Sequence, residues 1–255
     1  MNDSSVFARK LLWLTLCEMK SRYRGTWAGF LWVILNPLVF FAAIYVAFHE
    51  SLGGGAPRYP LLLAAGLLPW TFVSSTLGTH ANALCASRAL LLSLPLDPWL
   101  IVGSKVLDQF VSFAVVLAVL LGVFGKGLAF SPGFFAAIFL CVANLLFFVT
   151  ASLRGICALQ VFFRDTQFVL QFVNGVMFFL TPIFYAESSM SPLLRAAQHW
   201  NPYYSVIHPF QVCLTGGSRG EFLAAIAHGV CFSLAIGLCA RLFCRYRENA
   251  LYRAL

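Results

Sequence analysis

Six long stretches of this chain are apolar and almost free of charge. One of them, Ile101–Phe124, carries only Lys105 and Asp108, both near its start. The other five contain no Asp, Glu, Lys or Arg: Trp27–Phe48, Tyr59–Thr79, Gly127–Leu153, Thr166–Tyr185 and Phe222–Ala240. Crossing a hydrocarbon layer of ~30 Å takes about 20 helical residues, and backbone polar groups in lipid must be satisfied within the helix. The sequence therefore predicts an all-α polytopic membrane protein with six transmembrane helices.

The six spans and their connectors use nearly the whole chain. Hydrophobic residues make up 60% of the 255 residues and charged residues only 10%, a balance unlike that of a soluble domain. We therefore expect a single transmembrane domain over residues 1–255, with a cytoplasmic interfacial helix in 1–24 and the six spans in 25–255. No Gly-x-x-x-x-Gly-Lys-Ser/Thr loop is present, so the chain is not expected to hydrolyse nucleotide. We expect no catalytic site and no cofactor in this chain, and any energy for transport must come from another polypeptide.

The basic residues are distributed unequally along the predicted topology. If the N-terminus is cytoplasmic, 13 of the 17 Lys and Arg residues lie inside or at the inner border. The four on the outer side are Arg58, Lys126, Arg195 and Arg219. This asymmetry predicts a multi-pass protein with both termini in the cytoplasm. It also makes anionic lipid headgroups, and not nucleic acid, the expected partner of the net charge of +8.

The eight cysteines show no Cys-x-x-Cys pair and no zinc-like spacing with histidine. We therefore expect neither a metal site nor a disulfide framework.

The N-terminal segment and the start of the third span carry charges in helical patterns. In Val6–Arg24, Leu12, Leu16, Met19 and Tyr23 fall on one side of a helix, which predicts an amphipathic helix in the cytoplasmic headgroup layer. A charged juxtamembrane linker is the alternative. Lys105 and Asp108 are three residues apart and able to pair on one helix face.

The segment Ala186–Gly220, between the fifth and sixth spans, is the least regular part of the chain. It carries no formal charge between residues 196 and 218, but Asn201-Pro202, His208-Pro209 and Gly216-Gly217 interrupt it. Proline-broken polar backbone at membrane depth is tolerated only where protein covers it or where it lines a water-filled cavity. The pattern predicts two short re-entrant helices on the outer side, and a surface loop is the alternative.

Aromatic residues concentrate in the first and fifth spans. Aromatic faces bind the apolar C–H surfaces of sugar rings without gripping any one sugar, whereas lipid-facing bulk is the alternative for each residue. The residues expected to line a substrate conduit are Phe41, Tyr45, Phe172, Phe179 and Tyr185, with Tyr203 and Tyr204 near its outer exit.

Two cytoplasmic connectors are candidates for coupling to a partner protein. After Arg88, the run Ala-Leu-Leu-Leu-Ser-Leu-Pro is apolar but too short to span, which indicates a short helix docked against another surface. We expect Arg88 and Leu91 to contact a partner ATPase, with Arg164 and Asp165 of the next connector bracing them.

Five motifs, in order, resemble those of the polysaccharide and polyol-phosphate ABC exporter permeases, the Wzm-like O-antigen permeases with their TagG and KpsM relatives. The first is the run Lys20-Ser-Arg-Tyr-Arg-Gly-Thr-Trp-Ala-Gly-Phe-Leu-Trp-Val-Ile-Leu-Asn-Pro-Leu. The others are Gly66-Leu-Leu-Pro-Trp, Phe163-Arg-Asp, Thr181-Pro-Ile-Phe-Tyr and Asn201-Pro. The likeness covers nearly the whole chain. It departs in the connector after the second span, where family members commonly have an Asn-Leu-Ile-x-Lys-like stretch and this chain has Arg88 in a different context.

The resemblance implies a homodimer whose interface forms the conduit and two copies of a separate ATPase. It also implies a lipid-linked glycan that moves from the cytoplasmic to the outer face of a bacterial cytoplasmic membrane. The alternatives are a teichoic-acid or capsule exporter, a small-molecule ABC exporter and a membrane enzyme acting on lipid-linked sugars. A channel is disfavoured because no selectivity filter or charged ring is recognisable.

Overall fold

The computed structural model describes residues 3–23, 31–52, 58–94, 96–125, 128, 130–185 and 187–254. Part of the first motif, residues 24–30, therefore lies outside the described residues. The described chain is helical, with no strand in these ranges. The helices are α1 (Asp3–Tyr23), α2 (Leu31–Leu52), α3 (Tyr59–His80), α4 (Ala83–Ala86), α5 (Arg88–Ser93), α6 (Pro98–Phe124), α7 (Pro132–Phe162), α8 (Thr166–Leu180), α9 (Pro192–Gln198), α10 (Pro202–Thr215), α11 (Arg219–Tyr246) and α12 (Glu248–Ala254). A short 3₁₀ turn, η2, covers Glu187–Ser189.

Five helices of the described chain are long and apolar enough to cross a membrane: α2, α3, α6, α7 and α11. The chain is thus a multi-pass membrane protein. The remaining predicted span, Thr166–Tyr185, is represented by α8, which has 15 residues and a length of about 22 Å. Proline lacks an N–H and disfavours helix in the residue before it, so Pro182 ends the helix and leaves Thr181–Tyr185 irregular.

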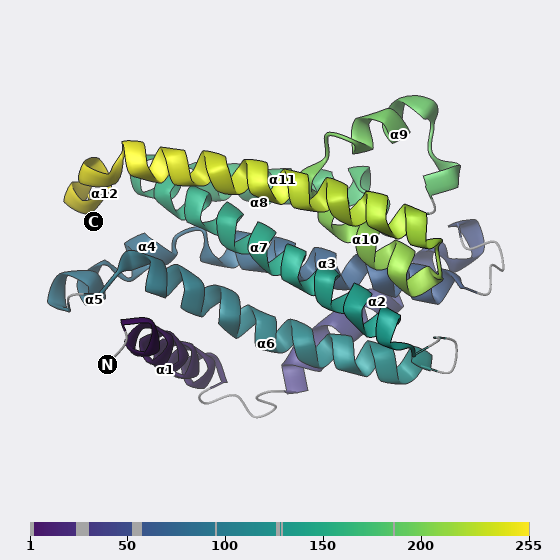
Figure 1. Ribbon diagram of the computed structural model, residues 1–255, viewed down its shortest axis with the longest axis horizontal. Helices are drawn as coiled ribbons and strands as arrows, with labels where there is room; N and C mark the ends of the chain where they lie inside the picture. The colour runs from purple at the N-terminus through teal and green to yellow at the C-terminus, as the bar shows by residue number, and fades with distance from the viewer. Residues whose placement is uncertain are drawn as a thin grey trace.

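The long helices lie side by side around α3 (Figure 1). α3 contacts α2, α6, α7, α8 and α10, and most of its side chains are buried. Both termini lie at one end of the bundle, together with α4, α5 and α12, whereas α9 and the α6–α7 connection lie at the other end (Figure 1). The cluster of buried hydrophobic residues therefore surrounds α3 along its whole length.

The segment between α8 and α11 contains two short helices, as the sequence predicts. α9 is mostly exposed, whereas nearly all of α10 is buried against α3, α7 and α11. The Asn201 side chain caps α10 by accepting hydrogen bonds from the backbone N–H groups of Tyr203 and Tyr204. Gly216 ends α10 with a φ of 81°, a left-handed conformation that glycine adopts without strain. The position of these helices relative to a membrane stays a prediction.

α1 packs against α6 through two ion pairs. Arg22 pairs with Asp108, and Glu18 pairs with Lys105 at 2.6 Å. Lys105 and Asp108 are close enough in sequence to pair with each other, but each pairs with a residue of α1 instead. The docking of α1 gives each of these side chains an oppositely charged partner that local spacing does not reveal. On α1 itself the helix prediction is confirmed, and Leu12 and Leu16 of the predicted apolar side are exposed.

Candidate functional site

Gly66 of α3 and Ile183 after α8 belong to two motifs singled out in the sequence, and they meet inside the bundle. A β-carbon built on Gly66 would lie 2.8 Å from the Ile183 carbonyl oxygen, so only glycine allows this approach. The Gln211 side chain of α10 donates to the Pro182 carbonyl at 2.6 Å, and the Tyr59 hydroxyl donates to the Phe184 carbonyl at 2.9 Å. The irregular backbone after α8 is thus satisfied by side chains of α3 and α10.

Another of the sequence motifs, Asn201-Pro, also contacts the end of α8. Asn201 Nδ2 donates to Thr181 Oγ1 at 2.9 Å and to Gln198 Oε1 at 3.0 Å. Gln198 Nε2 in turn donates to the Leu180 carbonyl at 2.8 Å. These contacts hold the C-terminal end of α8 in place. They thereby also set the orientation of the exposed side of α8.

A groove lined by uncharged polar side chains runs between α3 and α8. We call this cavity of about 600 Å³ the α3–α8 groove. Its lining residues are Phe40, Trp70, Thr71, Ser74, Ser75, Gly78, Thr79, Gln167, Gln171 and Asn174. Asn174 is held in place because it donates to the Ser74 carbonyl at 3.4 Å and accepts from the Tyr203 hydroxyl. Amides and hydroxyls at mid-helix are costly against lipid, so this groove is expected to face protein or water.

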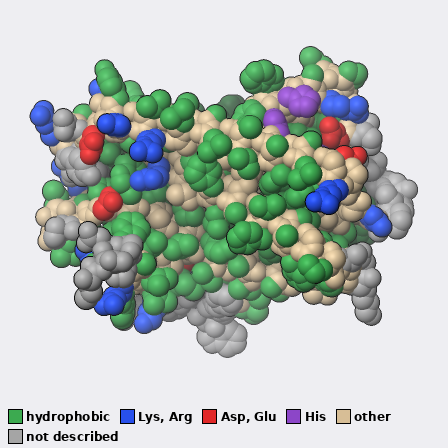
Figure 2. All heavy atoms as spheres, in the orientation of Figure 1, with side chains coloured by type: hydrophobic (Ala, Val, Ile, Leu, Met, Phe, Trp, Pro, Cys, Tyr) green, Lys and Arg blue, Asp and Glu red, His purple; other side chains and the backbone are tan. Residues whose placement is uncertain are grey.

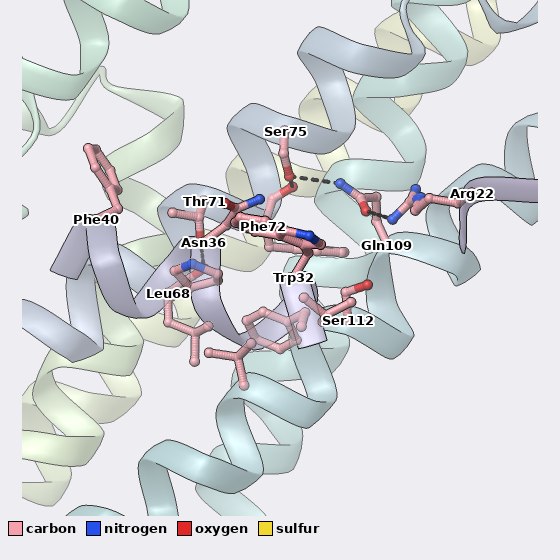
Figure 3. Close-up of a pocket in the computed structure, with 14 residues that line it drawn as sticks. Arg22, Trp32, Asn36, Phe40, Leu68, Thr71, Phe72, Ser75, Gln109 and Ser112 are labelled. Atoms are coloured by element: carbon pink, nitrogen blue, oxygen red, sulfur yellow. Dashed lines mark hydrogen bonds between the residues drawn. The ribbon is translucent and has the colours of Figure 1, made fainter. Parts of the chain in front are cut away.

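A second cavity, of about 540 Å³, adjoins the α3–α8 groove on the side of α1 and α6. We call it the Arg22 pocket (Figure 3). Arg22 Nη1 donates to Gln109 Oε1 at 2.6 Å, and Gln109 Nε2 donates to Ser75 Oγ at 3.0 Å. Phe40, Thr71 and Ser75 line both cavities. A polar route therefore leads from Arg22 of α1 past Ser75 to the face of α8.

Aromatic rings lie at exposed positions of α8, the helix that also supplies Gln167, Gln171 and Asn174 to the α3–α8 groove. Phe172 is 74% exposed and Phe179 is 65% exposed, and Phe168 lies on the same face. No residue of α8 is buried. The structure therefore presents two of the predicted conduit residues on an uncovered surface of the helix that lines the groove.

The other predicted conduit residues lie elsewhere. Phe41 and Tyr45 are half-buried and stacked on each other with ring centroids 6.0 Å apart. Tyr185 is half-buried, and its hydroxyl donates to the last carbonyls of α8. Tyr203 and Tyr204 are buried, and Tyr204 donates to Glu187 at 3.1 Å. Phe40, which was not among the predicted conduit residues, contacts α8, with its ring centroid 5.8 Å from that of Phe178. A role in transport stays a prediction for all of these residues.

The predicted coupling residues gather at the end of the bundle that holds both termini (Figure 1). Arg88 begins α5, which has no buried residue, and Leu91 packs against the core. Arg164 and Asp165 are exposed in the turn between α7 and α8. Burial raises the pKa of the Cys85 thiol, and the nearby charges of Arg164 and Arg88 oppose that rise. Both guanidinium groups therefore lie close to the same cysteine on α4.

The polar groove residues were not identified from the sequence. A signal was present, since Gln167, Gln171 and Asn174 recur at helical spacing on one side of an otherwise apolar segment. Within the described ranges no group of three His, Cys, Asp or Glu side chains could hold a metal ion.

Comparisons with known proteins agree with this architecture. The family profile described as "ABC-2 type transporter" matches residues 9–215. The "O-antigen export system permease protein RfbA" of Myxococcus xanthus is 30% identical over 208 residues, covering 79% of this chain and 78% of that protein. A protein of the same name from Klebsiella pneumoniae is 25% identical over 89% of this chain and 88% of its own length. The "Polysialic acid transport protein KpsM" of Escherichia coli is 25% identical over 93% of each chain.

Proposed function

The chain belongs to the ABC-2 type transporter family, and we propose that it is the membrane subunit of an exporter for a lipid-linked polysaccharide of the O-antigen type. The names of its relatives, O-antigen export permeases and a polysialic acid transport protein, support a polymer of sugars as the cargo. The polymer moves from the cytoplasmic to the outer face of a bacterial cytoplasmic membrane. Residues 1–255 act as one permease domain in this proposal.

One observation carries the proposal: α8 carries both exposed aromatic rings and part of the lining of the uncharged polar α3–α8 groove. A sugar ring offers apolar C–H surfaces to aromatic rings and hydroxyl groups to amides and hydroxyls. The groove residues supply both kinds of contact. None of them is charged, so a polymer can bind and be released at each step without being trapped by a buried charge.

We further propose six membrane crossings, with α8 and the irregular residues after it as the fifth. Asn174 contacts Ser74, Ile183 contacts Gly66, and Phe184 accepts a hydrogen bond from Tyr59. As the residue numbers rise from Asn174 to Phe184, the numbers of their contacts in α3 fall from Ser74 to Tyr59. Thr166–Tyr185 therefore runs antiparallel to α3 along most of its length, and this supports both termini on the cytoplasmic side. α9 and α10 then lie toward the outer side, and exposed Phe7, Leu12, Trp13 and Leu16 of α1 enter the headgroup layer.

A homodimer formed through α2 and α8 would enclose the groove. In α2 the one buried residue among those described is Ile44, and α8 has none. Gly175 lies on the open face of α8, where a β-carbon would meet no atom within 4 Å. In a cysteine-free background, Gly175→Cys should be cross-linked into a dimer by a bifunctional maleimide. Exposed Phe139→Cys of α7 should not, and equal cross-linking of the two would contradict this interface.

ATP is consumed by a separate partner in this proposal, and the chain itself uses no cofactor. Two ATPase copies dock where α5 projects from the bundle. Arg88 and Leu91 form the contact, and Arg164 and Asp165 brace it from the next connector.

Export by variants of the α8 face tests the proposed function. The chain and its partner ATPase are co-expressed in a host that makes the lipid-linked glycan, and surface glycan is measured. Gln171→Leu and Phe172→Ala should each lower export by about 2- to 10-fold, the equivalent of a contact of about 0.5–1.5 kcal/mol.

The matched control is Phe139→Ala, because Phe139 is 70% exposed on α7, similar to Phe172 at 74%. Membrane level and ATPase assembly should be unchanged in all three variants. Unchanged export by both α8 variants, or an equal loss in the control, would contradict the proposal.

A further inference from the structure

A groove between α7 and α11 shares no lining residue with the α3–α8 groove or the Arg22 pocket. We call it the α7–α11 groove. It has a volume of about 660 Å³, within the range of roughly 300–1,000 Å³ that is common for ligand sites. Figure 2 shows the face that contains α11, with Lys and Arg side chains gathered toward its ends and hydrophobic side chains between them.

Three arginines line the α7–α11 groove: Arg154 of α7, and Arg241 and Arg245 of α11. All three are exposed. The ion pairs of the described residues lie between α1 and α6, and none involves these arginines. The Arg154 guanidinium carbon lies 4.7 Å from the centre of the Trp99 ring, which fixes its position by a cation–π contact. One carboxylate, Glu248, lines the same groove, so its charge is strongly positive.

In each of the two helices, the first of these arginines directly follows the end of the charge-free stretch. In α7 the charge-free stretch ends at Leu153, just before Arg154. In α11 it ends at Ala240, just before Arg241. The charge-free parts of these helices, Pro132–Leu153 of α7 and Phe222–Ala240 of α11, are about 33 Å and about 28 Å long. Both lengths are close to the thickness of the hydrocarbon layer. The guanidinium groups of the groove are therefore placed at the level of the lipid phosphates.

The rest of the α7–α11 groove is apolar on the side away from α12. Phe147, Leu234 and Leu238 line it and are 46%, 56% and 59% exposed. Gly237 leaves the groove open at this point, because a β-carbon there would lie 3.3 Å from the Phe147 ring. At the other end α12 turns beneath the arginines and buries Leu251 to 2% exposure. The groove thus has a cationic pocket that continues into an apolar channel.

We propose that the α7–α11 groove is a binding site for an anionic phospholipid. The phosphate is bound by Arg154, Arg241 and Arg245, because a guanidinium group binds phosphate oxygens through two parallel hydrogen bonds. The acyl chains lie along Phe147, Leu234 and Leu238. Basic pockets between membrane helices on the cytoplasmic side bind such headgroups. This site is independent of the proposed export function.

Native mass spectrometry of the purified full chain in detergent tests this site, with tetraoleoyl cardiolipin and dioleoylphosphatidylcholine as probes. The wild type should bind cardiolipin at least about 10-fold more tightly than phosphatidylcholine. Each arginine near an anionic headgroup contributes roughly five-fold in affinity, so R154Q/R241Q/R245Q should bind cardiolipin on the order of 100-fold more weakly.

A second triple variant, K10Q/R219Q/R253Q, removes the same charge from exposed positions outside the groove and should bind within about two-fold of the wild type. R154K/R241K/R245K keeps the charge but not the paired hydrogen bonds, so its cardiolipin affinity should lie between that of the wild type and that of the glutamine variant. Binding by this variant shows that a loss in the glutamine variant is not a failure to fold. An equal loss in the control triple would overturn the site as a generic charge effect. If inorganic phosphate alone displaces cardiolipin at equal concentration, the groove binds a free anion and the lipid site is overturned. If R154Q/R241Q/R245Q no longer assembles with the partner ATPase but still binds cardiolipin, the groove is a protein-docking surface and the lipid site is overturned.

Discussion

Gly66 of α3 lies directly against the main chain of Ile183, so that a β-carbon on Gly66 would stand 2.8 Å from the Ile183 carbonyl oxygen and 2.8 Å from Gln211 Nε2. The same glutamine donates to the Pro182 carbonyl. This contact joins α3, α10 and the end of α8 at one point. The orientation of the exposed α8 face therefore depends on a residue that has no side chain.

Gly66→Ala should destabilise the protein. The neighbouring atoms include backbone, which cannot move aside, and overpacking of this kind costs about 1–3 kcal/mol. Thermal unfolding in detergent, followed by tryptophan fluorescence, should show a lower Tm. Gly122→Ala is the control because nothing lies within 4 Å of its β-carbon, and alanine there should be neutral or stabilising by up to about 1 kcal/mol. Equal Tm values for the two variants would show that the close approach does not matter.

The ion pair between Arg22 and Asp108 should contribute more to stability than the pair between Lys105 and Glu18. The Asp108 side chain is 3% exposed, so Arg22→Ala leaves a buried charge without a partner and should cost about 3–5 kcal/mol. Arg22→Ala combined with Asp108→Asn should recover part of that loss. Lys105→Ala should cost no more than about 1 kcal/mol, because Glu18 is 34% exposed. A double-mutant cycle by chemical unfolding measures both pairs, and similar values for the two would refute this ranking.

The proposed topology places Ser218 on the outer side and Arg88 on the cytoplasmic side. In a cysteine-free background, a membrane-impermeant maleimide added to intact cells should label Ser218→Cys. It should label Arg88→Cys only after the cells are opened. Both positions are exposed in the structure, so access depends on the membrane alone. Labelling of position 88 in intact cells would reverse the topology.

Arg88→Glu should uncouple ATP hydrolysis from export. α5 projects from the bundle with no buried residue, so a charge reversal there changes a contact with a partner and not the packing of the chain. Export should fall strongly while the membrane level of the variant stays normal. Arg253→Glu, an equal charge change at an exposed position of α12, serves as the control. Export at the wild-type rate by the Arg88 variant would contradict a role of α5 in coupling.

The long helices could be predicted from sequence because hydrophobicity over about 20 residues is a local property. The break at Pro182 and the two short helices that follow could also be predicted, since proline acts on its own neighbours. The ion-pair partners of Lys105 and Asp108 could not be predicted, because they lie on α1, far away in sequence. The α3–α8 groove was missed for the same reason. Ser74 and Gln171 become one surface only when two helices meet, and spacing within one helix does not show which helices those are.

Passage of sugar polymer along the face of α8 is the central claim, and site-specific photo-cross-linking tests it most directly. p-Benzoylphenylalanine replaces Phe172 of α8 or, as the control, Phe139 of α7, which is similarly exposed. The assembled exporter is illuminated while polymer is in transit, and the chain is probed for attached glycan. We expect glycan attached at position 172 and none at position 139. Glycan at position 139 and not at position 172, or at neither position during active export, would contradict the claim.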